Sequence, residues 1–104
     1  MKIKDIIKQQ GRSLSFEFFV PMDKKGESLL AGVIRGLEIL KPTFVTVTQS
    51  AGSSSLKNTR RMVKHIKGET PLEVMPHLAC LAYNKNEIED VLEDYRNLGI
   101  ENIL

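Results

Sequence analysis

Three polar residues near the ends of strand-like segments are the candidates for chemistry: Glu17, Thr48 and His77. Glu17 stands between Phe16 on one side and Phe18 and Phe19 on the other. An apolar setting penalises the charged form of a carboxyl group, so Glu17 would be partly protonated near neutral pH and could act as a general acid. A structural carboxylate paired with an arginine or a lysine explains the same pattern equally well.

The spacing of these residues favours a shared site. Thr48 follows Glu17 by 31 residues, and His77 follows Thr48 by 29. This spacing predicts that the three side chains lie at the same height, at the carboxyl ends of neighbouring strands, where barrel enzymes place their sites. Taken singly, Thr48 is better explained as a strand former, and His77 as a hydrogen-bonded histidine at a strand end.

Other candidates are weaker. His77 and Cys80 have the spacing of half a zinc site, but His65 is the only other His or Cys in the chain, so we expect no metal. Cys80 is expected to be a small buried thiol rather than a nucleophile. The serine-rich stretch 50–55 is expected to cap a helix rather than to bind phosphate. A solvated helix face explains a group of basic residues: Lys57, Arg60, Arg61, Lys64 and Lys67.

Alternating hydrophobic periods predict the strands and helices that position these residues. Strands are expected at 14–19, 44–48 and 72–78, where β-branched and aromatic residues dominate, and a further strand is expected to begin at 103. Helices are expected between them because apolar residues there recur at spacings of three and four.

Two of the expected helices carry specific signals. The stripe from Leu29 to Leu40 predicts a helix that Lys41 and Pro42 end. In the last helix, Asn86 is expected to be the N-cap, and Gly99 is expected to mark the end. A short extra helix is expected before the first strand.

The elements form a βαβαβαβ pattern with a period of about 30 residues, which predicts parallel strands joined by right-handed crossovers. In an open doubly wound sheet, strands are covered on both faces and read as continuous apolar runs. Here one face of each strand is apolar and the other carries Glu, Thr or His, which favours a barrel. We therefore expect an α/β fold that is a partial (β/α)8 TIM barrel. A complete barrel needs about 250 residues, so residues 1–104 would form one N-terminal portion, the first three βα units plus the start of strand four.

Composition excludes several classes of function. The net charge is +2 and basic residues are interleaved with acidic ones, so no nucleic-acid partner is expected. No apolar run approaches the roughly 18 residues of a membrane span, so we expect no membrane association. The charged start of the chain argues against a secretory signal, and a single cysteine fits a reducing cytoplasm.

Four ordered motifs resemble the methylenetetrahydrofolate reductase family. The first is Ser15–Phe19, which reads Ser-Phe-Glu-Phe-Phe as in the first strand of that family. The second is Leu40–Thr48, the third Pro76–Cys80 and the fourth Gly99–Leu104. Together they span nearly the whole chain. The resemblance implies a (β/α)8 barrel that holds FAD.

The resemblance also implies an activity and roles for individual residues. The family reduces 5,10-methylenetetrahydrofolate to 5-methyltetrahydrofolate in one-carbon metabolism, with NAD(P)H as the hydride donor to FAD. Glu17 matches the family's general acid, which protonates N10 of the folate and opens its five-membered ring to an iminium. Thr48 matches a residue at the nicotinamide and flavin site. Gln49, Ala51 and His77 match positions that contact FAD, and Gln49 stands where the family usually has tyrosine.

Two expectations for the whole chain follow. The first is a truncated, cytoplasmic member of the family that takes a folate substrate and has little activity alone. The alternative is a non-catalytic assembly module, because an open half-barrel exposes strand edges and apolar surface. The alternative predicts that the chain forms a homo-oligomer or associates with a complementary barrel fragment.

Overall fold

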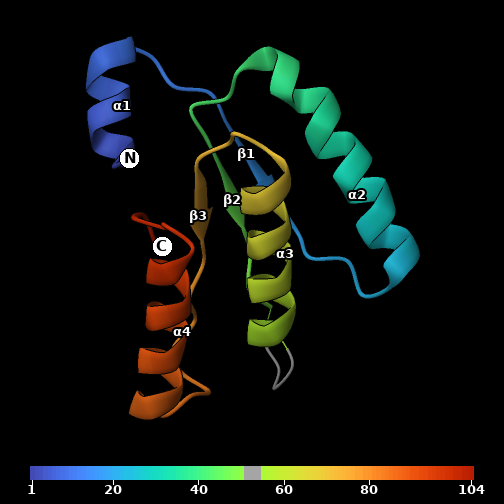
Figure 1. Ribbon diagram of the computed structural model, residues 1–104, viewed down its shortest axis with the longest axis vertical. Coiled ribbons are helices and arrows are strands. Elements are labelled where there is room, and N and C mark those ends of the chain that lie inside the picture. The colour runs from blue at the N-terminus through green and yellow to red at the C-terminus, as the bar shows by residue number, and fades with distance from the viewer. Residues whose placement is uncertain (51–54) are drawn as a thin grey trace.

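The computed structural model describes residues 1–50 and 55–104. Helices and strands alternate along the chain (Figure 1). Their order is α1 (Ile3–Gln10), β1 (Ser15–Phe18), α2 (Lys24–Leu37), a 3-10 turn (Glu38–Leu40), β2 (Phe44–Val47), α3 (Ser55–Glu69), β3 (Val74–Pro76) and α4 (Lys85–Asn97). The described helices include none that is both long and apolar enough to cross a bilayer.

The three strands form one parallel sheet in the order β1-β2-β3. Ser15 pairs with Phe44 and Val45 pairs with Val74, so neighbouring strands are offset by 29 residues in both pairs. Parallel strands need a crossover connection between them, and α2 and α3 provide it. The expected α/β class and parallel order are confirmed, and they are consistent with the first units of a βα barrel.

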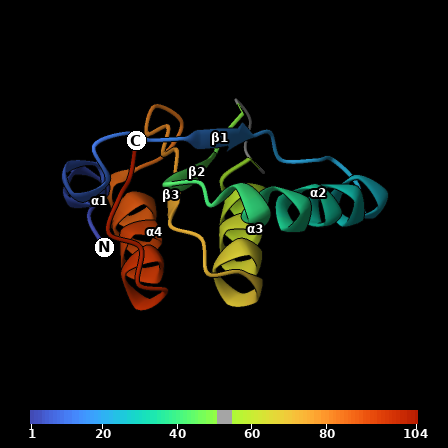
Figure 2. The same cartoon turned by 90° about the horizontal axis from the view of Figure 1, so that it is seen from above.

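The hydrophobic core lies between the sheet and the helices on one side of it. Figure 2 shows α3 and α4 side by side on the same side of the sheet, with α2 next to α3. On β2, Val45 and Val47 point to this side and are fully buried. They pack with a cluster from the helices that includes Ile34, Leu56, Met62, Val63, Ile66, Val91 and Tyr95. Successive side chains of a strand point to opposite faces, so the residues between these apolar ones point to the other face of the sheet, which is polar.

Helix α2 with its 3-10 extension ends where expected but begins at Lys24, before the apolar stripe, and it is packed along only part of that stripe. Asp23 caps it by accepting a hydrogen bond from the Gly26 amide at 2.7 Å. Its 3-10 extension ends at Leu40 and is followed by Lys41, which has a φ of 49°. Ile34 is 1% exposed, whereas Leu29 is 64% exposed. The amphipathic pattern therefore predicted the helix correctly, but much of its apolar surface has no cover in this structure.

The amino-terminal end of the sheet is tied to both ends of the chain. The Asn102 side chain accepts a hydrogen bond from the Ile3 amide at 2.9 Å and donates one to Glu73 at 3.0 Å.

The last residue of the chain bonds to the carboxyl end of β3. The Leu104 amide donates to the Pro76 carbonyl at 3.0 Å, and the Leu78 amide donates to the Leu104 carbonyl at 2.8 Å. This alternation is the bonding pattern of a parallel neighbour, although residues 101–104 are not assigned as a strand. The expected fourth strand is thus present only as this first pair of bonds beside β3.

The N-cap of α4 differs from the expected one. Asn84, not Asn86, caps the helix: its side chain accepts from the Glu87 amide, and the Glu87 side chain accepts from the Asn84 amide, both at 2.9 Å. Each asparagine is followed three residues later by a glutamate, so the sequence offers two capping boxes. Starting at Lys85 adds two residues that the apolar stripe does not require. Gly99 has a φ of 73° just beyond the helix, as a C-terminal glycine should.

Replacing the capping residue should distinguish the two asparagines. Asn84→Ala removes the acceptor for the Glu87 amide and should lower the free energy of unfolding by about 1 kcal/mol. Asn86→Ala is the matched control, because Asn86 lies inside the first turn, where alanine is the better helix former. Urea denaturation of the three proteins measures the difference. Equal destabilisation by both substitutions would contradict this assignment of the cap.

Tyr95 is the largest fully buried side chain of the core. Burial raises the pKa of its hydroxyl to about 12, against a smaller opposing effect of the positive charge of Arg60. The hydroxyl has no hydrogen-bond partner among the described residues. The folded state therefore holds the phenol proton more tightly than the unfolded chain does.

The loss of stability at alkaline pH should reveal the raised pKa of Tyr95. The unfolded tyrosine titrates near pH 10, so the contribution of the protonated form is present below that pH and is lost as the pH rises towards about 12. Between these values, urea denaturation should show the wild type losing about 2–3 kcal/mol more stability than Tyr95→Phe. Tyr83→Phe retains Tyr95 and should follow the wild type. Parallel curves for wild type and Tyr95→Phe would show that the hydroxyl is solvated.

Candidate functional site

The candidate site lies on the face of the sheet opposite the helices. The register places Glu17 of β1 beside Thr46 of β2 and Thr46 beside Met75 of β3. Paired residues of parallel strands point to the same face, and Phe16 and Phe18 alternate with Glu17 to point to the other. The Glu17 side chain is 54% exposed, whereas Thr46 between the outer strands is buried.

One carboxylate oxygen of Glu17 joins all three strands. The Thr46 hydroxyl donates a hydrogen bond to Glu17 Oε2 at 3.3 Å. His77 Nε2, just beyond β3, lies 3.5 Å from the same oxygen. His77 Nε2 is buried and has no hydrogen bond to any described residue, so at 3.5 Å its link to Glu17 is a charge interaction that is strongest when the imidazole is protonated.

The aromatic neighbours of Glu17 do not enclose it as the sequence pattern predicted. Phe18 is buried on the helical face, and Phe19 is 77% exposed. Residues adjacent in a strand point apart, so a carboxylate flanked by phenylalanines in sequence is not flanked by them in space. The alternative was an arginine or lysine partner for Glu17. Within residues 1–50 and 55–104 its charged partner is His77 instead.

The end of β2 is fixed to both neighbouring strands and to α3. The Thr48 amide donates to the Phe18 carbonyl at 3.0 Å, and the His77 amide donates to the Val47 carbonyl at 2.9 Å. The buried Thr59 hydroxyl of α3 donates to the Thr48 carbonyl at 2.9 Å. Thr48 and His77 are therefore held at the same level, as expected.

Glu17 does not share that level. With an offset of 29 residues, its lateral neighbour is Thr46, two residues before Thr48. Thr46 was not among the predicted site residues, because the spacing between polar residues does not give the register of the strands. The signal was present in the alternation of Val45, Thr46 and Val47, which places Thr46 on the polar face.

Gln49 connects the segments that follow β2 and β3. Its Oε1 accepts from the Ala79 amide at 2.9 Å, and its Nε2 donates to the Ala79 carbonyl at 3.4 Å. The Gln49 side chain therefore bonds to the backbone amide and carbonyl of Ala79 as the backbone of a neighbouring strand would. Ala51, the remaining predicted site residue, lies outside the described residues, as do three other positions of the serine-rich stretch.

Cys80 is exposed, contrary to expectation, because it lies in the connection after β3 and not against the core. Its Sγ is 3.6 Å from the Leu78 carbonyl. In the part of the chain that the structure describes, no three His, Cys, Asp or Glu side chains are grouped to hold a metal ion.

Comparisons with known proteins agree on one relationship. Residues 2–104 match the family model for methylenetetrahydrofolate reductase. The chain is 40% identical to the 5,10-methylenetetrahydrofolate reductases of Salmonella typhimurium and of Escherichia coli over 92 residues, which cover 88% of this chain and 31% of each relative. It is 33% identical to methylenetetrahydrofolate reductase (NADH) 1 of Arabidopsis thaliana, over 99% of this chain and 17% of that protein. The chain thus spans about a third of the length of the bacterial relatives.

The role of Gln49 as a connector can be tested by hydrogen exchange. Gln49→Ala removes both bonds to Ala79 and should speed exchange of the Ala79 amide several-fold, since an exposed hydrogen bond contributes about 1 kcal/mol. Gln49→Glu keeps the acceptor for that amide and should retain most of the protection. If both variants exchange at the wild-type rate, the bonds do not persist in solution.

Proposed function

This chain belongs to the methylenetetrahydrofolate reductase family, and from that membership we propose that it supplies the first three βα units of a flavin-dependent (β/α)8 barrel. In this proposal the reaction is the reduction of 5,10-methylenetetrahydrofolate to 5-methyltetrahydrofolate. The substrate would bind over the polar face of the sheet, at the carboxyl ends of β1, β2 and β3. Sites in barrel enzymes are found at this end of the strands.

Glu17 is the proton donor in this proposal. Its Oε2 is engaged by the Thr46 hydroxyl and faces His77 Nε2, while its other oxygen makes no hydrogen bond to a described residue. That oxygen can carry a proton to N10 of the folate, which opens the five-membered ring. The carboxylate left after the transfer is stabilised by the Thr46 donor and by a protonated His77. Glu17 and its two partners are the observation that carries the proposal.

The end of the sheet also suits a flavin. FAD, when bound, would accept a hydride from NAD(P)H and deliver it to the folate. His77 supports this fit because its buried Nε2 has no hydrogen bond in the described part of the chain, and buried polar atoms are ordinarily satisfied. Thr48, Gln49, Ala51 and His77 are the residues that would hold the cofactor. Gln49 would do so by fixing Ala79, since its amide is already engaged there.

A second candidate function, assembly without catalysis, is favoured by the exposed apolar surface. Phe19 is 77% exposed and Met22 fully exposed after β1, and Leu29 of α2 and Ile39 of the following 3-10 turn are 64% and 82% exposed. Isolated apolar residues are common on surfaces, but several large ones together with the open edge of β1 indicate a surface that another chain segment covers. That segment is either a second copy of the chain or a complementary barrel fragment.

A chimera tests the catalytic role. In the Escherichia coli relative, the segment aligned with this chain is replaced by residues 1–104, and FAD content and folate reduction are measured. We expect the chimera to bind FAD and turn over, and Glu17→Gln within it to lower kcat by about 10²- to 10⁴-fold without loss of FAD. Glu69→Gln, at the far end of α3, is the control of equal charge and should leave kcat unchanged.

Two results would oppose the proposal. A chimera that holds FAD and keeps its kcat in Glu17→Gln would remove Glu17 from the proton transfer. Full turnover by the 104-residue chain alone would contradict the expectation that it has little activity by itself. Sedimentation of the chain alone addresses assembly: a monomer at micromolar concentration would argue against pairing with a second copy.

A further inference from the structure

The basic face of α3 is not simply solvated, as the sequence pattern suggested. Arg60 forms an ion pair with Asp94 of α4, and Arg61 forms one with Glu27 of α2. Lys64, one turn beyond Arg60 on the same side of α3, forms no ion pair with any described residue. The helix therefore uses Arg60 and Arg61 to hold the neighbouring helices and keeps Lys64 unpaired between them, while Lys67 pairs with Glu73 just before β3.

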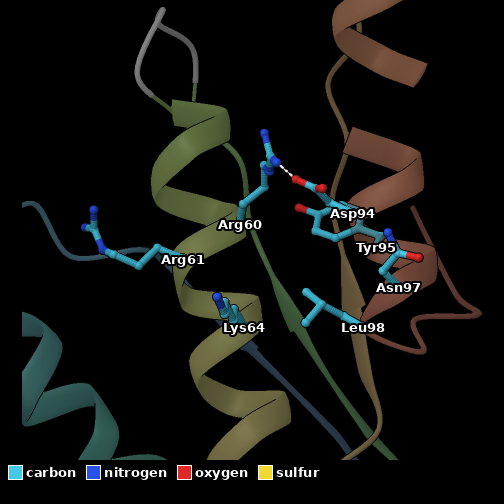
Figure 3. Close-up of a pocket in the computed structure, with 7 residues that line it drawn as sticks. All are labelled: Arg60, Arg61, Lys64, Asp94, Tyr95, Asn97 and Leu98. Carbon is cyan, nitrogen blue, oxygen red and sulfur yellow. Dashed lines mark ion pairs between the residues drawn. The ribbon is translucent and has the colours of Figure 1, made fainter. Parts of the chain in front are cut away.

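A groove runs between α3 and α4 beside this unpaired lysine. Figure 3 shows Arg60 and Lys64 on the α3 side and Asp94, Tyr95, Asn97 and Leu98 on the α4 side, with the Arg60–Asp94 pair bridging one end. Its volume is about 400 Å³, within the range of small-molecule sites. The groove lies on the helical side of the sheet, away from Glu17, and plays no part in the proposed reductase chemistry.

The floor of the groove contains an unsatisfied polar group. The Tyr95 ring extends from α4 towards α3, and its hydroxyl lies beside the Arg60–Asp94 pair (Figure 3). Tyr95 is fully buried, and the hydroxyl has no hydrogen-bond partner among the described residues. Burying a hydroxyl without a partner is unfavourable, so an acceptor brought to this point would relieve the cost.

We propose that this groove binds a small aryl carboxylate. The ring of the ligand would lie against Leu98, whose side chain provides aliphatic surface on the α4 side of the groove. The carboxylate would replace that of Asp94 beside Arg60 and accept a hydrogen bond from the Tyr95 hydroxyl, with Lys64 adding a second positive charge.

Asp94 shows where an anion sits in the free protein. Its carboxylate already pairs with Arg60, so Arg60 accepts an anion at that point without rearrangement. Its side chain is 47% exposed, and it can turn to solvent when a ligand takes its place. Asp94 is therefore an internal competitor, and removing its charge should strengthen binding.

Binding of benzoate to the ¹⁵N-labelled chain, followed by NMR, tests this site. We expect a Kd of about 1 mM, with shifts concentrated at amides of α3 and α4 around Lys64 and Tyr95. Benzamide has the same ring without the charge and should bind at least about tenfold more weakly, as charged acceptors make the stronger hydrogen bonds.

Paired variants separate the groove from general electrostatic attraction. Asp94→Asn should lower the Kd for benzoate at least about threefold, whereas Glu93→Gln, the same charge change on α4 outside the groove, should leave it within about twofold. Lys64→Met should raise the Kd at least about threefold, with Lys57→Met as its control on α3. Tyr95→Phe keeps the ring and should also weaken binding. Equal affinity for benzamide, controls that change the Kd as much as their partners, or no shifts in the groove at about 50 mM benzoate would each overturn the proposal.

Discussion

The 29-residue register between neighbouring strands is the constraint on which the other features depend. It brings Val45 against Val74 on the helical face and Glu17 against Thr46 on the polar face. A slip of one residue would exchange the two faces of a strand, burying Glu17 and exposing its apolar neighbours. The apolar face is thus what holds the register, because Val45 and Val47 are fully buried under α3. The polar face takes its geometry from that packing and contributes little to it.

This division explains why the polar residues can be used for chemistry. Neither Glu17 nor His77 belongs to the hydrophobic core, so their side chains are not required for packing. Their positions are nevertheless fixed by backbone bonds, such as that from the His77 amide to Val47, and by the Thr59 hydroxyl that ties α3 to Thr48. Sites built on regular elements hold their groups more accurately than sites on loops.

Much of this architecture could be predicted from the sequence, and the errors have physical causes. Hydrophobic periods located the three strands and four helices of the described residues, because burial on one face imposes them. They could not fix α4's first turn, where Asn84 and Asn86 offer equivalent capping boxes and only the backbone path selects one. They also predicted apolar surroundings for Glu17. That prediction was wrong, because side chains adjacent in a strand point to opposite faces and are not neighbours in space. Thr46 was missed because register follows strand pairing, which a distance between polar residues does not measure.

Some surface properties had no sequence signal of this kind. The basic residues of α3 have the spacing of a solvated face, and only the positions of α2 and α4 turn Arg60 and Arg61 into links between helices. The same packing buries Tyr95 and isolates its hydroxyl. An amphipathic pattern states which face of a helix is buried but not which neighbour it meets, so polar groups at helix–helix boundaries depend on tertiary structure. On the opposite face of the sheet the register places Glu17 beside Thr46, whereas His77, which follows β3, comes to Glu17 only through its side chain.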